Sequence, residues 1–332
     1  MKNNSHNLPL VTVILPNFNH AQYLKQRLDS VFDQTYQNFE VILLDDKSTD
    51  NSREILSQYA KHEKVTHCIF NEINSGNTFK QWSKGISLAK GDLIWIAETD
   101  DFCDNSFLEK VVKPFQDEPE LALSYCQSNR INEKGEITGN WITHTENLNQ
   151  TLFLKDFIQS GNEFIQHFLI YKNVIPNASA VVFKKKKADE AGEFDFDPVL
   201  KTCGDWLFYI KLISNAKIYF IHESLNNFRY HSESVISRSL QKDVRTSIID
   251  IELKTRKKIV KFLGNKKTDQ LSVIYAKNKE INIDLKYEKG VLFLETNKKI
   301  KGAFILSTIL KTFLERYKFR QKLKSKIAKI LK

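Results

Sequence analysis

Apolar and polar positions along the N-terminal part of the chain follow two periods. Short apolar runs rich in β-branched residues end at polar or proline positions and predict buried strands at 10–15, 39–44, 65–70 and 92–97. Apolar residues that recur every three or four positions predict helices at 21–32, from about 51 and at 78–89. Repeated strand–helix units of this kind predict an α/β fold with a parallel sheet.

Three polar clusters follow the ends of three of these strands. They are Asn17-Phe18-Asn19, Asp45-Asp46 and Glu98-Thr99-Asp100-Asp101. The carboxyl ends of parallel strands lie at one edge of a sheet, and ligands of such sheets bind beyond that edge. We therefore expect the three clusters to line one crevice.

The pattern is looser after Asp101. It predicts helices at 106–116 and 161–170, strands at 122–125 and 178–183, and a polar stretch at 129–149. The basic run Lys184–Lys187 is typical of a solvated turn. From Gln241 onward the periodicity is helical. The sequence thus predicts an α/β domain at 8–240 and a basic helical region at 241–332.

Length and composition support a globular protein. A chain of 332 residues with 41% apolar residues can form one large domain and a smaller appendage. No apolar stretch approaches the roughly 20 residues that a membrane span requires. The segment Met1–Leu8 lacks the apolar core of a signal peptide, so we expect a cytosolic protein. The four cysteines form no CxxC pair and have no zinc-like spacing to histidine, so we expect reduced thiols.

The net charge of +10 is unevenly distributed. From Glu252 to Lys332 there are 23 Lys or Arg and 7 Asp or Glu, whereas residues 1–251 hold 27 and 33, so the two parts carry +16 and −6. An acidic front part argues against a nucleic-acid-binding catalytic domain. A basic rear part is suited to anionic lipid or nucleic acid.

Acidic residues are concentrated after the strand at 92–97. Glu98, Asp100 and Asp101 follow it, and no basic residue occurs between Lys90 and Lys110. A Mg²⁺ or Mn²⁺ ion would relieve the repulsion, and such ions bind through one or two carboxylates together with phosphate oxygens. A solvated acidic loop or helix cap is the alternative. No GxGxxG or GxxxxGK[ST] glycine loop is present, which disfavours a dinucleotide-dependent dehydrogenase and a P-loop kinase.

An ordered series of motifs resembles the inverting family-2 glycosyltransferases with the GT-A fold. The segments are VTVILPNFN (11–19), QTY (34–36), FEVILLDDKSTD (39–50), AKGD (89–92) and ETDD (98–101). The resemblance covers roughly residues 8–237. It implies transfer of a sugar, with inversion, from a nucleotide-diphosphate donor, most often a UDP-sugar, to an acceptor hydroxyl. It also implies a divalent metal cofactor, a glycan or lipid-linked glycan acceptor, and a role in cell-surface polysaccharide, lipopolysaccharide or capsule synthesis.

The resemblance also implies roles for individual residues. Pro16, Phe18 and Asn19 would line the nucleotide pocket, although Asn19 is also suited to a structural cap, and Asp46 would hydrogen-bond the base. Asp100 would contact the ribose or sugar, and Asp101 would hold the metal on the diphosphate. Glu98 stands where the family often has the first acid of a DxDD motif.

Asp205 is the candidate catalytic base. Transfer with inversion needs a base that takes the proton of the acceptor hydroxyl. Asp205 follows Gly204 and opens an apolar helix, where an acid is also favoured by the helix dipole alone. The segment resembles the family motif of an acidic residue followed by Trp, here Asp205-Trp206, with Gly204 in place of a common first acid.

The segment Phe228–Ser237 resembles the Tyr-Arg-x-His motif that ends many family-2 catalytic domains. The resemblance implies that His231 ligates the metal or donates to the diphosphate. Arg229 would neutralise charge on the leaving group.

The C-terminal tail is strongly basic. Residues 311–332 hold nine basic residues and one acidic residue between apolar positions, which is typical of a helix on an anionic membrane surface. The location would then be peripheral, on the inner face of the cytoplasmic membrane; the alternative is a helix packed on its own domain.

Two other function classes are alternatives to a glycosyltransferase. A nucleotidyltransferase-type enzyme would usually carry a basic glycine-rich loop. A non-catalytic nucleotide-sugar-binding protein would more often lack Asp101 or Asp205.

Overall fold

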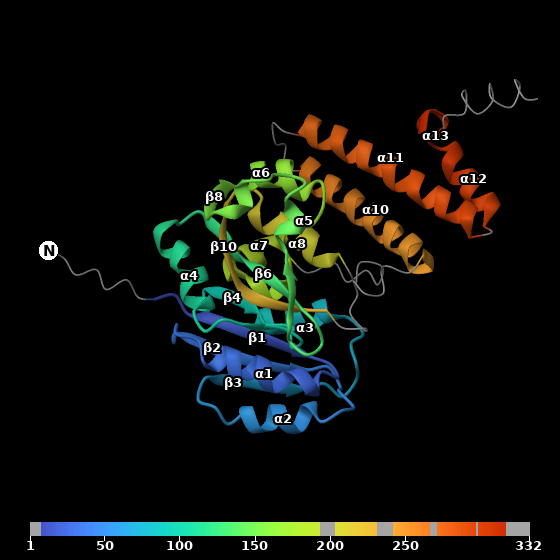
Figure 1. Cartoon of the computed structure of the whole chain (residues 1–332). Coiled ribbons are helices and arrows are strands. Elements are labelled where there is room, and N and C mark those ends of the chain that lie inside the picture. Colours follow the sequence, from blue (N-terminus) through green and yellow to red (C-terminus); the bar gives the residue numbers. More distant parts are fainter. Residues whose placement is uncertain (1–7, 193–202, 231–241, 266–270, 297, 317–332) are drawn as a thin grey trace, which may run out of the picture. The chain divides into compact units, whose positions relative to one another are not determined.

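The computed structural model describes residues 8–192, 203–230, 242–265, 271–296 and 298–316 (Figure 1). The chain divides into two units, Met1–Ser234 and Val235–Lys332. All four cysteines are free thiols, and Cys103 and Cys126 are buried.

The first part of the N-terminal unit alternates strands and helices as the sequence predicts. Its elements are β1 (Val11–Asn17), α1 (Ala21–Phe32), β2 (Phe39–Asp45), α2 (Ser52–Tyr59), β3 (Val65–Phe70), α3 (Thr78–Leu88) and β4 (Leu93–Ile96). The strands β2, β1 and β4 pair in parallel, and β3 pairs in parallel with β2. Their carboxyl ends therefore lie at one edge of the sheet.

The two faces of β1 pack against different helices. Val13 and Leu15 share a buried cluster with Leu28 of α1 because alternate residues of a strand point to the same face. On the other face, Ile14 lies so close to Gly85 of α3 that a Cβ at Gly85 would be 2.3 Å from its Cγ2. Helices thus cover both faces of the sheet, and the polar ends of the strands remain at its edge.

The second part of the N-terminal unit is less regular. Its elements are β5 (Phe102–Cys103), α4 (Phe107–Asp117), β6 (Leu121–Ile131), β7 (Ile137–Asn140), α5 (Ile142–Thr145), β8 (Phe157–Ser160), α6 (Gly161–Phe164), β9 (Val181–Lys184), α7 (Lys185–Ala191), α8 (Gly204–Ile213) and β10 (Lys217–Arg229). Short helical turns occupy Leu152–Leu154, Ile165–Leu169 and Ala178–Ala180.

The expectation of a parallel sheet is only partly correct. Across the described residues, the sheet has the strand order β3-β2-β1-β4-β9-β6-β10-β5, with β7 on β6 and β8 on β10. β9 runs antiparallel to both β4 and β6, and β10 runs parallel to β6. The strand β10, which the sequence pattern did not predict, brings Arg229 back to the acidic loop.

The basic run at 184–187 was predicted as a turn, and this prediction is wrong. Lys185 begins α7, and Ala188 of that helix is buried. Lys185 pairs with Asp189, and Lys187 pairs with Glu190. Ion pairs at helical spacing allow a lysine-rich segment to form a helix.

The C-terminal unit is helical in its described residues, as predicted. Its elements are α10 (Lys242–Asn265), α11 (Leu271–Glu295), α12 (Lys299–Ser307) and α13 (Leu310–Arg316). Within this described part, no helix combines the length and apolar character needed to cross a membrane.

Candidate active site

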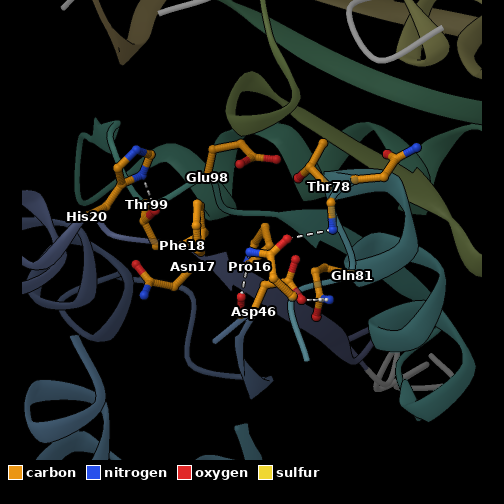
Figure 2. A pocket seen from close by; sticks show the side chains of 12 residues that line it. Pro16, Asn17, Phe18, His20, Asp46, Thr78, Gln81, Glu98 and Thr99 are labelled. Carbon is orange, nitrogen blue, oxygen red and sulfur yellow. Dashed lines mark hydrogen bonds between the residues drawn. The ribbon is translucent and has the colours of Figure 1, made fainter. Parts of the chain in front are cut away.

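A crevice opens at the carboxyl edge of the parallel strands (Figure 2). It has a volume of about 430 Å³. Pro16 and Phe18 line it at the end of β1, Asp46 after β2, and Glu98 after β4. Phe18 is 46% exposed, which leaves its ring free to meet a ligand. The three polar clusters therefore each contribute to one cavity, as expected from strand polarity.

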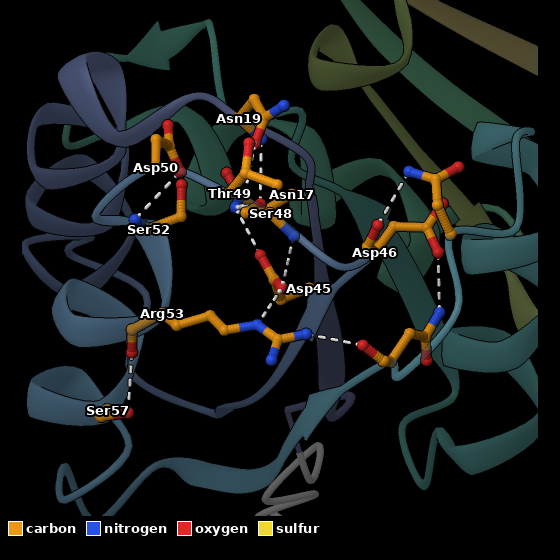
Figure 3. A network of polar contacts seen from close by, with 12 residues as sticks. Asn17, Asn19, Asp45, Asp46, Ser48, Thr49, Asp50, Ser52, Arg53 and Ser57 are labelled. Atoms are coloured by element: carbon orange, nitrogen blue, oxygen red, sulfur yellow. Dashed lines mark hydrogen bonds and ion pairs between the residues drawn. The ribbon is translucent and has the colours of Figure 1, made fainter.

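A hydrogen-bond network fixes the loops that follow β1 and β2 (Figure 3). Asn17 Nδ2 donates to Asp45 Oδ1 at 2.9 Å and to Ser48 Oγ at 3.1 Å. The other oxygen of Asp45 accepts from Ser48 N and from Arg53 Nε, each at 3.0 Å. Asp45 is buried, so its partners satisfy a charge that would otherwise be costly.

Asn19 belongs to this network and does not line the cavity. Its φ of 55° lies in the left-handed region, which Asn tolerates better than most residues. Its Oδ1 accepts from Thr49 N at 2.7 Å, and its N–H donates to Ser48 Oγ at 2.9 Å. These contacts support the structural role that the sequence analysis gave as the alternative for Asn19. A contact between Asn19 and the nucleotide stays a prediction.

Asp46 is held rigidly at the wall of the cavity. Its Oδ1 accepts from Asn71 Nδ2, Ser75 N and Gln81 Nε2 at 2.8–2.9 Å, and its Oδ2 accepts from Ser75 Oγ at 2.7 Å. Three of these donors approach Oδ1, so Oδ2 retains the larger capacity to accept an N–H from a base.

The acidic loop carries two carboxylates of raised pKa, the half-buried Glu98, which lines the cavity, and the buried Asp101. Burial first, and then the charges of Asp100 and Asp101, raise the pKa of Glu98 to about 8. Burial and the charge of Asp100 raise the pKa of Asp101 to about 7. Trp82 Nε1 donates to Glu98 Oε1 at 2.7 Å and fixes that side chain. The site is therefore short of positive charge.

Two arginines distant in sequence approach this acidic loop. The charge of Arg27, a buried residue of α1, opposes the raised pKa of Glu98 and of Asp101. Arg229 is 2% exposed, and its backbone N–H donates to Asp101 Oδ1 at 3.0 Å. No basic residue is near the acidic loop in sequence, but two arginines are near it in the folded protein. The pKa values of Glu98 and Asp101 nevertheless remain raised.

The contacts of Arg229 indicate a positioning role. Its Nε donates to the carbonyl of Asp100 at 2.7 Å, and its terminal nitrogens donate to the carbonyls of Asn132 and Glu133 and to Gln26 Oε1. These bonds hold the guanidinium away from the cavity lining. Direct contact with a leaving group stays a prediction that this geometry does not favour.

The acidic loop fits a divalent cation bound by few protein ligands. Asp101 Oδ2 is buried and has no hydrogen-bond partner among the described residues. Carboxylate oxygens are the ligands that Mg²⁺ and Mn²⁺ prefer. No cluster of three or more acidic, His or Cys side chains suited to a metal occurs in the described part of the chain, so phosphate oxygens would complete the set. His231, the other predicted ligand, lies outside the described residues.

Gly204 allows the start of α8 to lie against α3. A Cβ at Gly204 would lie 2.4 Å from Cε2 of Phe79, which belongs to α3 next to the cavity. The acidic side chain that is common at this position of the motif therefore has no room at position 204 of this protein. Asp205 lies in the first turn of α8, next to this contact with α3, and does not itself line the cavity.

Asp205 has the environment of a proton acceptor. Burial raises its pKa to about 6, against the opposing hydrogen bonds of the Trp206 backbone and Asn173. Asn173 Nδ2 donates to Asp205 Oδ2 at 3.0 Å. Burial, and then the charges of Asp205 and Glu98, raise the pKa of Tyr209. The charges of both carboxylates act on Tyr209, so Asp205 and Glu98 both lie in the neighbourhood of this tyrosine.

The sequence interpretation missed three supporting residues. Asn173, Trp82 and Gln81 orient Asp205, Glu98 and Asp46 respectively. Gln81 and Trp82 follow the turn at 74–77 on α3, and this proximity to a polar turn was the available signal. No local pattern marks Asn173, because its partner is 32 residues away.

About half of the chain matches a known protein family. Residues 12–175 match the model of glycosyl transferase family 2. The putative teichuronic acid biosynthesis glycosyltransferase TuaG of Bacillus subtilis is 33% identical over 150 residues, which cover 45% of this chain and 59% of TuaG. The family match over residues 12–175 includes the loops that form the cavity and the acidic loop.

Two solved structures share the fold. TarS 1-349 of S. aureus in complex with UDP-GlcNAc aligns with a TM-score of 0.57 at 16% identity, over 88% of each chain. The mannosyltransferase PcManGT of Pyrobaculum calidifontis, in complex with GDP-Man and Mn²⁺, aligns with a TM-score of 0.59 at 14% identity, over 96% of this chain and 84% of that one. The α/β domain has the GT-A glycosyltransferase fold, and the chain belongs to glycosyl transferase family 2.

Proposed function

We propose that the protein transfers a sugar, with inversion, from a nucleoside-diphosphate donor to an acceptor hydroxyl. The proposal is carried by a half-buried Asp205 of raised pKa, at the start of the helix whose Gly204 packs on Phe79 of α3, together with the open crevice and the acidic loop. Phe18 and Asp46 would hold the nucleoside. A UDP-sugar is the donor we favour, because TarS was solved with UDP-GlcNAc, and GDP-mannose is the alternative suggested by PcManGT.

Asp205 performs the proton transfer in this proposal. Ionised Asp205 accepts the proton of the acceptor hydroxyl while that oxygen attacks the anomeric carbon, and the bond from carbon to the diphosphate oxygen breaks. Asn173 holds the carboxylate in one orientation during the attack. One displacement inverts the anomeric centre, so no covalent enzyme intermediate forms.

The acidic loop would bind a divalent cation, Mn²⁺ or Mg²⁺, in the same proposal. When bound, the cation neutralises charge that accumulates on the leaving diphosphate. Asp101 would supply the principal ligand through Oδ2, and Glu98, held by Trp82, would lie close by. The backbone N–H of Arg229 donates to Oδ1, the other oxygen of Asp101, and so fixes this carboxylate.

The acceptor in this proposal is a glycan of a cell-surface polysaccharide pathway. TuaG, whose description names teichuronic acid biosynthesis, supports this assignment.

A donor screen tests the proposed function. Binding of UDP-, GDP- and dTDP-sugars is measured by calorimetry with Mn²⁺ and with EDTA, and donor hydrolysis is followed in parallel. We expect one donor to bind with Mn²⁺ and to bind much more weakly with EDTA. Absence of binding by every donor, with and without metal, would contradict the transferase assignment.

We also propose that the C-terminal unit associates with an anionic membrane surface. On α12, Ile300 and Phe304 are one turn apart and are 87% and 70% exposed, whereas Leu306 is buried. Lys299 and Lys301 flank the exposed pair, as in helices that lie in a membrane interface. Of the tail predicted at 311–332, only the part up to Arg316 lies within the described residues.

Vesicle sedimentation tests the membrane proposal. Because burial of large apolar side chains stabilises the bound state, we expect the double change Ile300→Ser and Phe304→Ser to weaken binding to vesicles containing phosphatidylglycerol by about tenfold. Ile137→Ser, at a 66% exposed site of the N-terminal unit, is the matched control and should have no effect. Equal binding by all three proteins would contradict the proposal.

A further inference from the structure

A groove lined by both polar and apolar side chains lies within the C-terminal unit, between α11 and the chain around the start of α13. It has a volume of about 640 Å³. One wall is a face of α11, which contributes Tyr275, Asn278, Lys279, Asn282, Ile283 and Lys286. The opposite wall is the segment Thr308, Ile309, Leu310, Lys311 and Thr312.

The groove carries positive charge that the described residues do not neutralise. Lys279, Lys286 and Lys311 line it, no acidic residue lines it, and none of the three lysines makes an ion pair within the described part of the chain. The nearby acids have other partners. Those pairs are Glu280 with Lys277, Asp284 with Arg316, and Glu288 with Arg245. Three ammonium groups without counter-charges favour an anionic ligand.

Buried acceptors accompany the lysines. Asn278 is 8% exposed, and its Oδ1 has no hydrogen-bond partner among the described residues. The same holds for Oδ1 of Asn282, one helical turn later. A buried carbonyl oxygen without a donor costs free energy until a donor reaches it. These two oxygens therefore favour a ligand that brings O–H or N–H groups together with its negative charge.

We propose that this groove binds an anionic glycan, meaning a sugar chain that carries carboxylate or phosphate groups. The lysines would pair with the acidic groups, and the two asparagine oxygens would accept from hydroxyl or amide groups of the sugar. Lysines alone would equally suit lipid headgroups or a nucleic acid. The inference rests on the proposed function, since the bound chain would be the acceptor of the transferred sugar or its extended product.

Binding of hyaluronan oligosaccharides, in which carboxylate sugars alternate with neutral ones, tests the groove in the full-length protein. Neutral dextran of similar length is the comparison ligand. We expect the triple change Lys279→Gln, Lys286→Gln and Lys311→Gln to weaken hyaluronan binding by about 10- to 100-fold, since each exposed ion pair contributes modestly. Dextran should bind weakly to every protein.

A matched triple variant separates the effect of the groove lysines from the effect of net charge. Lys254, Lys257 and Lys261 are exposed on α10 of the same unit and do not line the groove. Changing these three to Gln removes the same charge and should alter hyaluronan affinity by less than about threefold, because distant charges are screened by salt. An equal loss in both triple variants would overturn the inference.

The asparagines provide a second readout. Asn282→Ala should weaken hyaluronan binding and leave binding of inorganic sulfate unchanged, because the sugar supplies donors to Oδ1 and sulfate has no hydrogen to donate. Binding of phosphatidylglycerol vesicles or RNA at the groove lysines, with no binding of hyaluronan, would also overturn the inference.

Donor binding distinguishes this inference from the proposed function. Manganese-dependent donor binding should be unchanged in the groove variant. If the wild-type protein binds a donor but no hyaluronan, the groove assignment alone fails. If hyaluronan binds in the groove and no donor binds, the assignment as an acceptor site fails together with the proposed function.

Discussion

The change Asp205→Asn should lower the rate of sugar transfer by about 10²- to 10⁴-fold, the usual contribution of a positioned base. Asn has nearly the same shape and cannot take the acceptor proton. Donor affinity should stay within about twofold, because the base acts on the acceptor. Initial rates with saturating donor, together with calorimetric donor affinities, measure both effects. Equal rates for the two proteins would exclude Asp205 as the base.

The pH profile gives an independent check on Asp205. Its pKa is raised to about 6 by burial, and only the ionised form accepts a proton, so the wild-type rate should fall as pH is lowered through about 6. The hydrogen bond from Asn173 opposes this raised pKa, so Asn173→Ala should shift the profile to higher pH. A merely structural role of Asn173 would lower the rate and leave the profile in place.

The change Asp101→Asn should abolish the metal dependence of donor binding and raise the thermal stability of the ligand-free protein. The folded state binds the Asp101 proton more tightly than the unfolded chain does, so stability from this group is lost as pH rises through about 7. Asn carries no charge, and its Oδ1 can still accept from Arg229 N. At pH 8 we expect the melting temperature to rise by about 4–8 °C, the shift that about 2 kcal/mol gives in a domain of this size.

Asp104→Asn is the matched control for this experiment. Asp104 lies three residues further along the chain, is exposed, and caps the start of α4 through Ser106. Its substitution should leave metal-dependent donor binding intact and should not raise the melting temperature. If Asp101→Asn retains manganese-dependent binding, Asp101 is not the metal ligand.

The helices and strands near the N-terminus could be predicted closely because each forms around its own periodic pattern. The expected helix at 21–32 and strand at 65–70 have the bounds that the structure gives to α1 and β3. The basic run at 184–187 could not be predicted correctly, because the helix α7 depends on burial of Ala188 and on ion pairs with later residues.

The candidate site was predictable where one strand end supplies one cluster. Phe18, Asp46 and Glu98 meet at the cavity because parallel strands expose their carboxyl ends at one edge. Contacts between distant segments could not be predicted in this way. Arg229 reaches Asp101 across 128 positions of sequence, and a tertiary contact of this kind leaves no periodic signal.

The sequence by itself determined the fold class, the family and the three acidic or polar loops, because strand periodicity and short motifs are local properties of the chain. Tertiary structure alone decided that β9 runs antiparallel within the sheet, and that Gly204 is small because Phe79 occupies the space beside it. It also decided how far each carboxylate is withdrawn from water. Desolvation, which depends on the packed environment, raises the pKa values of Glu98, Asp101 and Asp205, and the charge of Asp100 raises those of Glu98 and Asp101 further.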